Sequence, residues 1–123
     1  MVSLGRETYT FLLSKNPCEI FDYYKVKDMH GLNKIDCQLH TNNEEQSYIA
    51  GWSNFIPGTE ERFVFVNLAR CTNPINTITL INHEMMHHSL WLHNYDIENK
   101  EEEIISWAEN ETKEIYKILR IYE

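Results

Sequence analysis

The chain has 123 residues, a mass of 14.7 kDa and a net charge of -8. This length suits one compact domain, so we expect a single domain over residues 1–123. The acidic balance would repel a phosphate backbone, and nucleic acid is therefore not an expected partner. No apolar run approaches the roughly 20 residues that cross a bilayer, and the first residues lack the pattern of a secretory signal. We expect a cytoplasmic protein that has no membrane partner.

The three cysteines, Cys18, Cys37 and Cys71, are odd in number and widely spaced, and no two of them form a Cys-x-x-Cys pair. In a chain expected in the cytoplasm, this pattern predicts reduced thiols rather than a disulfide framework or a cysteine-rich zinc site. We expect all three to serve as small buried apolar residues.

The first half of the chain alternates apolar segments with turn residues. A short helix is expected over residues 3–14, ending near Asn16-Pro17, because the residue before a proline avoids the helical region. Four segments rich in β-branched and aromatic residues then predict strands, at 20–26, 35–39, 48–55 and 62–68. The Pro57-Gly58 turn predicts an antiparallel hairpin between the last two strands. Both faces of 62–68 are largely apolar, so this strand is expected to be buried.

The pattern becomes helical from residue 73. Asn73 suits the N-cap and Pro74 the first helical position, and apolar residues at helical spacing predict a helix of about 20 residues that Asn94 could close. A second helix is expected to begin after residue 96 or 99 and to run to the C-terminus, with an inward stripe of apolar and small residues. That stripe consists of Ile104, Ile105, Ala108, Thr112, Ile115, Leu119 and Tyr122. The expected fold class is α+β, with a small antiparallel or mixed sheet of about four strands packed on these two helices.

The first of these helices contains the sequence His83-Glu84-Met85-Met86-His87. Residues four apart on an α-helix share a face, so His83 and His87 could bind one ion between them. Zn²⁺ accepts imidazole nitrogens, and a catalytic zinc site uses three protein ligands plus a water molecule. Glu84 is placed to take a proton from that water as general base. The alternative is that the two histidines only pack or hydrogen-bond on one helix face.

One candidate for the third zinc ligand is His93. It completes the longer motif His-Glu-x-x-His-x-x-Gly-x-x-His, except that Leu90 stands in the place of the glycine. The glycine allows the sharp turn that brings the last histidine back towards the metal. If the helix instead continues through Leu90, His93 lies about 120° from His87 around the axis, which makes it a minor candidate.

The other candidates are the glutamates that open the second helix, Glu101, Glu102 and Glu103. At about 100° per residue, Glu101 falls within the inward stripe, whereas Glu102 and Glu103 lie about 100° or more from its centre. A carboxylate directed at a core is costly unless a charged partner or a metal satisfies it. The helical face therefore favours Glu101 as the third ligand, while Glu102 suits a capping role opposite Asn99.

This arrangement, His83-Glu84-x-x-His87 followed by a helix that begins with glutamates, resembles the gluzincins, and in particular the minigluzincins and the ImmA/IrrE-like metallopeptidases. The resemblance extends over residues 47–110. It implies a zincin-like fold with His83, His87 and Glu101 as zinc ligands and Glu84 as catalytic base. It also implies that strand 62–68 borders the cleft and could pair with an extended substrate. The pattern Glu-Ala-Asn-x-Phe-Ala of ImmA-like proteins would instead give the ligand role to Glu103.

The leading functional hypothesis is a zinc metallopeptidase that hydrolyses peptide bonds in a peptide or protein substrate through a metal-activated water, with Glu84 as general base. The alternative is a zinc-stabilised binding or regulatory module with little or no proteolytic activity, because so short a chain leaves few residues for substrate pockets. A third hypothesis is a metal-free structural domain, whose melting temperature a chelator would not change.

Overall fold

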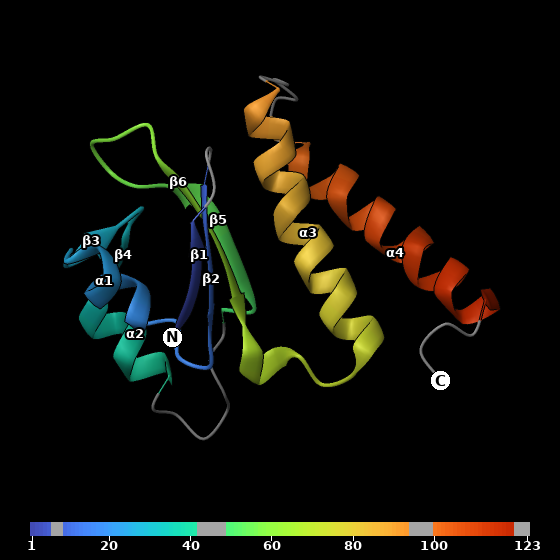
Figure 1. Cartoon of the computed structure of the whole chain (residues 1–123), viewed down its shortest axis with the longest axis horizontal. Helices are drawn as coiled ribbons and strands as arrows, with labels where there is room; N and C mark the ends of the chain where they lie inside the picture. The colour runs from blue at the N-terminus through green and yellow to red at the C-terminus, as the bar shows by residue number, and fades with distance from the viewer. Residues whose placement is uncertain (6–8, 42–48, 94–99, 120–123) are drawn as a thin grey trace.

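The computed structural model describes residues 1–5, 9–41, 49–93 and 100–119, which form an α+β fold around a four-stranded mixed sheet (Figure 1). Two short helices lie on one side of this sheet and two long helices lie on the other, where α3 packs on the sheet and α4 packs on α3. The short helices are α1 (Glu19–Tyr24) and α2 (Lys34–Thr41), and the long helices are α3 (Pro74–Leu92) and α4 (Glu101–Leu119). No helix of the described residues is both long and apolar enough to cross a membrane.

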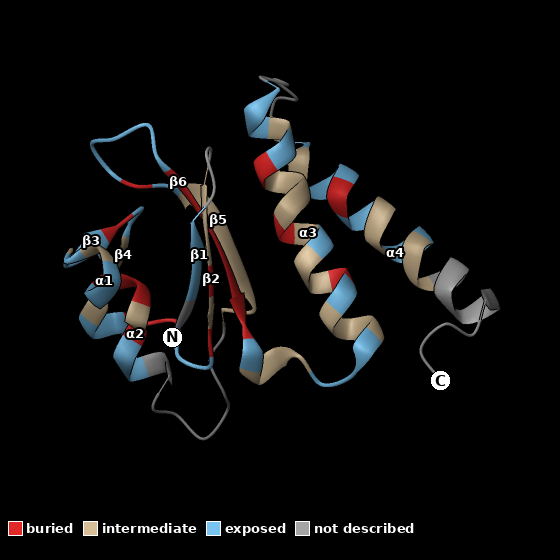
Figure 2. Cartoon of the chain, in the orientation of Figure 1, coloured by how far each residue is buried: buried red, intermediate tan, exposed pale blue. Residues whose placement is uncertain are grey.

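The sheet has the strand order β1-β2-β6-β5. Its strands are β1 (Val2–Gly5), β2 (Tyr9–Ser14), β5 (Gly51–Phe55) and β6 (Arg62–Asn67). β2 runs parallel to β6, whereas the pairs β1–β2 and β5–β6 are antiparallel. All six residues of β6 are buried, as Figure 2 shows along the middle of the sheet. Within the described part of the chain, β5 is an edge strand of this sheet.

The two faces of the sheet bury different residues, because successive side chains of a strand point to opposite sides. Phe63 and Phe65 of β6 join the main apolar core, on the side of α1 and α2. Val64 and Val66 therefore point to the side of α3. The other buried members of the main core are Leu12, Cys18, Ile20, Phe21, Met29, Cys37 and Ile56.

The second half of the chain agrees with the predictions. β5 and β6 form the antiparallel hairpin, and the N–H of Ile56 donates to the carbonyl of Glu61 at its turn. Asn73 is the N-cap of α3, where its side chain accepts from the N–H of Asn76 at 2.8 Å. The predicted helix end at Asn94 and the two predicted start points of the second helix lie outside the described residues.

The predicted helix over residues 3–14 is wrong, because this segment forms β1 and β2. β2 pairs along its whole length with β6 as well as with β1. These hydrogen bonds to a strand some 50 residues away in the chain override the weak local preference for a helix.

The predicted strands at 20–26 and 35–39 are also wrong, because they form α1 and α2. Just before α1, whose N-cap residue is Cys18, the side chain of Asn16 accepts from the N–H of Cys18 at 3.0 Å. Asn33 caps α2, where it accepts from the N–H of Asp36 at 2.8 Å and donates to the carboxylate of Asp36 at 2.9 Å. These side-chain bonds satisfy backbone groups at or just before the helix starts, and β-branched composition alone does not reveal them.

A two-stranded hairpin, β3 (Asp28–Met29) and β4 (Leu32–Asn33), connects α1 to α2. His30 and Gly31 form its turn, both with positive φ. The Nε2 atom of His30 lies 2.5 Å from the carbonyl oxygen of Phe55 at the end of β5. This contact places the hairpin turn beside the edge of the main sheet.

Candidate metal centre

α3 carries the predicted triad on the face directed at β5 and α4. The possible ligand atoms of His83, Glu84 and His87 all lie within 4.8 Å of one another. The Nε2 atoms of His83 and His87 are 3.3 Å apart. Helical spacing thus brings the three residues together as the sequence predicts.

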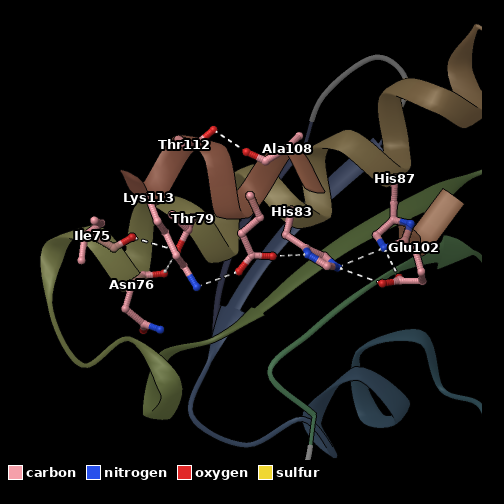
Figure 3. A network of polar contacts seen from close by, with 10 residues as sticks. Ile75, Asn76, Thr79, His83, His87, Glu102, Ala108, Thr112 and Lys113 are labelled. Atoms are coloured by element: carbon pink, nitrogen blue, oxygen red, sulfur yellow. Dashed lines mark hydrogen bonds and ion pairs between the residues drawn. The ribbon is translucent and has the colours of Figure 1, made fainter. Parts of the chain in front are cut away.

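The opening of α4 brings a third group to the two Nε2 atoms, and this group is Glu102. Its Oε1 lies 2.6 Å from Nε2 of His87 and its Oε2 lies 3.5 Å from Nε2 of His83 (Figure 3). The side chain of Glu102 is 67% exposed, so its carboxylate can reach the pair from the solvent side.

The other nitrogen of each imidazole contacts a different glutamate of α4. Glu109 Oε2 lies 2.7 Å from Nδ1 of His83, and Glu101 Oε1 lies 2.5 Å from Nδ1 of His87. Lys113 Nζ, in turn, lies 3.2 Å from the other oxygen of Glu109. Each carboxylate can accept an Nδ1–H from its histidine, and a histidine in that tautomer has its Nε2 lone pair available for a metal ion.

The Nε2 atoms of His83 and His87 and the Glu102 carboxylate therefore lie together. A proton on Nε2 of His87 would satisfy its 2.6 Å contact with Glu102. With both Nε2 atoms unprotonated, a divalent cation could bind all three groups. The chemistry and placement of these groups fit a cation-binding site.

The predicted candidates for the third ligand thus occupy different places. Glu101 faces Nδ1 of His87, on the other side of the ring from Nε2. Glu102 faces both Nε2 atoms, and Glu103 is exposed. α3 continues through Leu90 to Leu92, which leaves His93 exposed at its C-cap.

The inward face of α4 agrees in part with the predicted stripe. Ile105 is fully buried and Ile104 is 38% exposed, and the side chain of Glu101, at 40% exposed, is more buried than that of Glu102, at 67%. Sequence reasoning did not identify Glu109, although it follows Glu102 by seven residues and so lies on the same helical face two turns later. That spacing is a signal that could have identified it.

Glu84 is buried against β5. Its side chain is opposite Gly51, where a Cβ atom would lie 2.6 Å from Glu84 Cγ and 2.7 Å from Oε1. Its Oε2 has no hydrogen-bond partner among the described residues. Burial raises the pKa of Glu84 to about 7, although the nearby imidazoles of His87 and His83 act in the opposite direction. A carboxyl group with this pKa can exchange a proton near neutral pH.

Gly51→Ala is expected to lower the free energy of unfolding by about 1–3 kcal/mol, because the added methyl group cannot fit unless Glu84 moves. Urea denaturation measures this change. The matched control is Gly5→Ala in β1, where a Cβ would meet nothing within 4 Å. Equal stability of the two variants would contradict the close packing of Glu84 on β5.

In the metal-free protein, Glu84→Gln is expected to increase stability at pH 8 and to change it little at pH 4. The folded state holds the Glu84 proton more tightly than the unfolded chain, because its pKa is raised from 4.5 to about 7. As the pH rises from about 4.5 to about 7, the unfolded chain loses this proton before the folded protein does, so the free energy of unfolding falls. Glutamine has no such proton to lose, so the variant avoids this decrease in the free energy of unfolding, which reaches about 3 kcal/mol at most.

Urea denaturation in the presence of a chelator at both pH values measures this difference. Glu103→Gln is the control. Because Glu103 is exposed, this variant should have the stability of the wild type at both pH values. Equal stability of wild type and Glu84→Gln at pH 8 would contradict the burial of a carboxylate at this position.

Arg62 is a buried cation on the same side of the sheet. It is 6% exposed, its guanidinium lies 5.0 Å from the centre of the Trp91 ring, and its Nη2 donates to the carbonyl of Ser53 at 3.4 Å. Its charge contributes to lowering the pKa of Glu84, against the larger effect of burial. Sequence reasoning treated Arg62 only as the first residue of a strand, and the charge was a signal that it did not use.

A cleft of about 650 Å³ lies beside the triad. Its polar wall includes His83, Glu84 and Glu102, and the opposite wall comes from β5, the segment before it and the β3–β4 hairpin. The apolar residues that line the cleft are Leu32, Ile49, Ala50, Trp52 and Leu80. The candidate metal centre therefore opens onto a cavity large enough for a side chain and the backbone around it.

The sheet edge at this cleft is β5. The implication that strand 62–68 could pair with a substrate is wrong, since β6 already pairs with β2 on one side and β5 on the other. The carbonyl of Ala50 accepts from the N–H of Asn67, so the backbone groups of Gly51 and Ser53, at alternate positions, face away from β6.

Comparison of the chain with protein-family models, with curated proteins and with solved structures found no match.

Proposed function

We propose that this protein is a zinc-dependent metallopeptidase with a zincin-like fold of the gluzincin type. The observation that carries the proposal is the convergence of the His83, His87 and Glu102 acceptors beside the buried carboxyl group of Glu84. Zinc sites that catalyse hydrolysis combine three nitrogen or oxygen ligands with a general base and an open position. The cleft next to Glu84 would supply the open position.

His83, His87 and Glu102 would hold the zinc ion. Ligands at 2.0–2.1 Å in a tetrahedral arrangement lie about 3.3 Å from one another. The two Nε2 atoms are 3.3 Å apart and Glu102 Oε2 lies 3.5 Å from Nε2 of His83, which suits zinc, whereas Glu102 Oε1, at 2.6 Å from Nε2 of His87, would have to move back when the ion binds. In this proposal the third ligand is Glu102 rather than the Glu101 favoured by the sequence, because Glu101 contacts the nitrogen that faces away from the shared point.

Glu101 and Glu109 would act as positioning residues for the two histidines. A metal-binding histidine usually donates its other ring N–H to a carboxylate or carbonyl, which fixes its orientation and increases its basicity. Glu109 and Glu101 contact the Nδ1 atoms of His83 and His87 in this way. Lys113 would in turn hold Glu109 in place.

Bound zinc would supply Lewis-acid polarisation of the scissile carbonyl group and of a water molecule. Glu84 would accept the proton of the attacking water and then donate it to the leaving amine. A pKa of about 7 suits both steps near neutral pH, since the carboxyl group can gain and lose the proton. Gly51 leaves room for the carboxyl group beside the sheet edge.

The proposed substrate is an extended peptide with an apolar side chain near the scissile bond. The outward backbone groups of Gly51 and the outward N–H of Ser53, whose carbonyl already accepts from Arg62, could pair with such a peptide as an added strand. Trp52, Ile49 and Leu80 give the neighbouring cleft an apolar lining that suits an aliphatic or aromatic side chain.

Peptide hydrolysis by the purified chain tests this proposal. After removal of metal with a chelator, a library of quenched fluorescent peptides should show no cleavage, and one equivalent of zinc should restore it. Peptides with apolar residues near the cleaved bond should be cut faster than their acidic counterparts. A chain that binds one zinc ion and cleaves no peptide would support the binding or regulatory module instead, and a chain that binds no zinc would support the metal-free domain.

A further inference from the structure

Cys18 and Cys37 lie together in the core on the other side of the sheet. Cys18 is the N-cap residue of α1, and Cys37 lies in α2. Their Sγ atoms are 2.7 Å apart, and the two residues are 3% and 0% exposed. They are 19 positions apart in the chain, and the segment between them includes α1 and the β3–β4 hairpin, so the tertiary fold creates this contact.

The distance between the two sulfur atoms is suited to bond formation. Even carbon atoms, which are smaller than sulfur, rest at about 3.5–4.0 Å when they are not bonded. A disulfide requires about 2.05 Å, with the two Cβ atoms about 3.8 Å apart. The fold thus already holds the sulfur atoms within about 0.7 Å of bonding distance.

We propose that Cys18 and Cys37 are a redox pair that closes into an intramolecular disulfide when the chain folds in the presence of a small-molecule disulfide such as glutathione disulfide. The thiolate of one cysteine attacks the oxidant and releases one glutathione thiol, which leaves a mixed disulfide. The second cysteine thiolate then attacks the protein sulfur and releases the other glutathione thiol. The two cysteine thiols lose two electrons and two protons, and glutathione disulfide is reduced to two molecules of glutathione.

The bond would join the start of α1 to α2. It would thereby hold in place the β3–β4 hairpin between them, which forms part of the wall of the cleft. α2 begins directly after β4, and Leu32 of β4 lines the cleft. Cys71 is not part of this pair, because its Sγ contacts the backbone carbonyl of Asn67 after β6. The reduced thiols expected in the cytoplasm and the disulfide proposed under oxidation are two states of the same pair.

The test is the intact mass of the chain after refolding in glutathione disulfide. Refolding exposes both thiols to the oxidant before the core closes over them. The expected product is a monomer with one internal disulfide, in which Cys71 either carries one glutathione or is the residue that reacts with an alkylating reagent under denaturing conditions. Peptide mapping without reductant should find a Cys18–Cys37 cross-link, and dithiothreitol should lower the melting temperature of this product by about 5 °C or more.

Single serine variants separate this pair from non-specific oxidation. Cys71→Ser should still form the cross-link, whereas Cys18→Ser and Cys37→Ser should not, and each would retain a mixed disulfide with glutathione. A bond between Cys71 and either other cysteine, or three alkylated cysteines in the refolded wild type, would overturn the proposal. The test involves neither zinc nor peptide cleavage, so its outcome is independent of the proposed function.

Discussion

Glu84→Gln is expected to lower kcat for peptide hydrolysis by at least about a hundredfold and to leave one zinc ion bound per chain. Glutamine keeps the shape of the side chain that packs against Gly51 but cannot accept a proton. General acid–base catalysis by a positioned side chain contributes about 10²–10⁴-fold to a rate. Steady-state kinetics with a fluorescent peptide, together with elemental analysis of the same sample, measures both quantities.

The matched control for this variant is Glu103→Gln, which makes the same chemical change at an exposed position of α4. It should preserve both the rate and the zinc content. Full activity in Glu84→Gln would contradict the role of Glu84 as base. Loss of zinc from Glu84→Gln would make Glu84 a ligand rather than a base, an outcome that its distance from the two histidines makes worth measuring.

Glu102→Ala is expected to weaken zinc binding more than any other single change among the glutamates of α4. Its carboxylate faces the Nε2 atoms of His83 and His87, so its removal takes away one of the three proposed ligands. Loss of a carboxylate that only orients a histidine typically costs 10–100-fold in metal affinity, which is the range we expect for Glu101→Gln and Glu109→Gln. Competition titration with a chromophoric chelator gives the dissociation constant of each variant.

The order of these affinities distinguishes the two assignments of the third ligand. The structure-based proposal requires the largest loss at Glu102 and smaller losses at Glu101 and Glu109. A larger loss at Glu101 would restore the assignment that the helical stripe favours. Glu103→Gln is again the control, because its side chain is exposed and should not change the affinity.

The sequence predicted those parts of the fold whose signals are local. Asn73 and Pro74 mark the start of α3, and the capping bond from the N–H of Asn76 confirms this interpretation. The Pro57-Gly58 turn likewise joins two strands that pair with each other. In both cases the residues that determine the structure lie within a few positions of one another.

The first half of the chain could not be predicted in the same way, because its structure depends on distant partners. β2 is a strand since it lies between β1 and β6, and β6 is remote in sequence. The segment that forms α1 was predicted as a strand, because it is rich in aromatic and β-branched residues. Ile20 and Phe21 are instead buried on one side of a short helix against the sheet.

The candidate site likewise has a part that local sequence predicts and a part that depends on distant contacts. His83, Glu84 and His87 belong to one helix, so their spacing alone brings them together. The roles of the α4 glutamates depend on how that helix is rotated against α3. Glu101 is more buried than Glu102, as the stripe predicts, but it is Glu102 that faces the two Nε2 atoms. Gly51 and Arg62 approach the site from the sheet, and only the tertiary fold places them there.

The zinc content of the chain tests the central claim most directly. The wild-type protein, stripped with a chelator, supplied with excess zinc and desalted, should retain one zinc ion per chain by elemental analysis. The double variant His83→Ala/His87→Ala should retain none, while His93→Ala, which alters the exposed histidine at the end of α3, should retain one. A wild-type chain without zinc, or a double variant that still holds one equivalent, would contradict a metal centre built on His83 and His87.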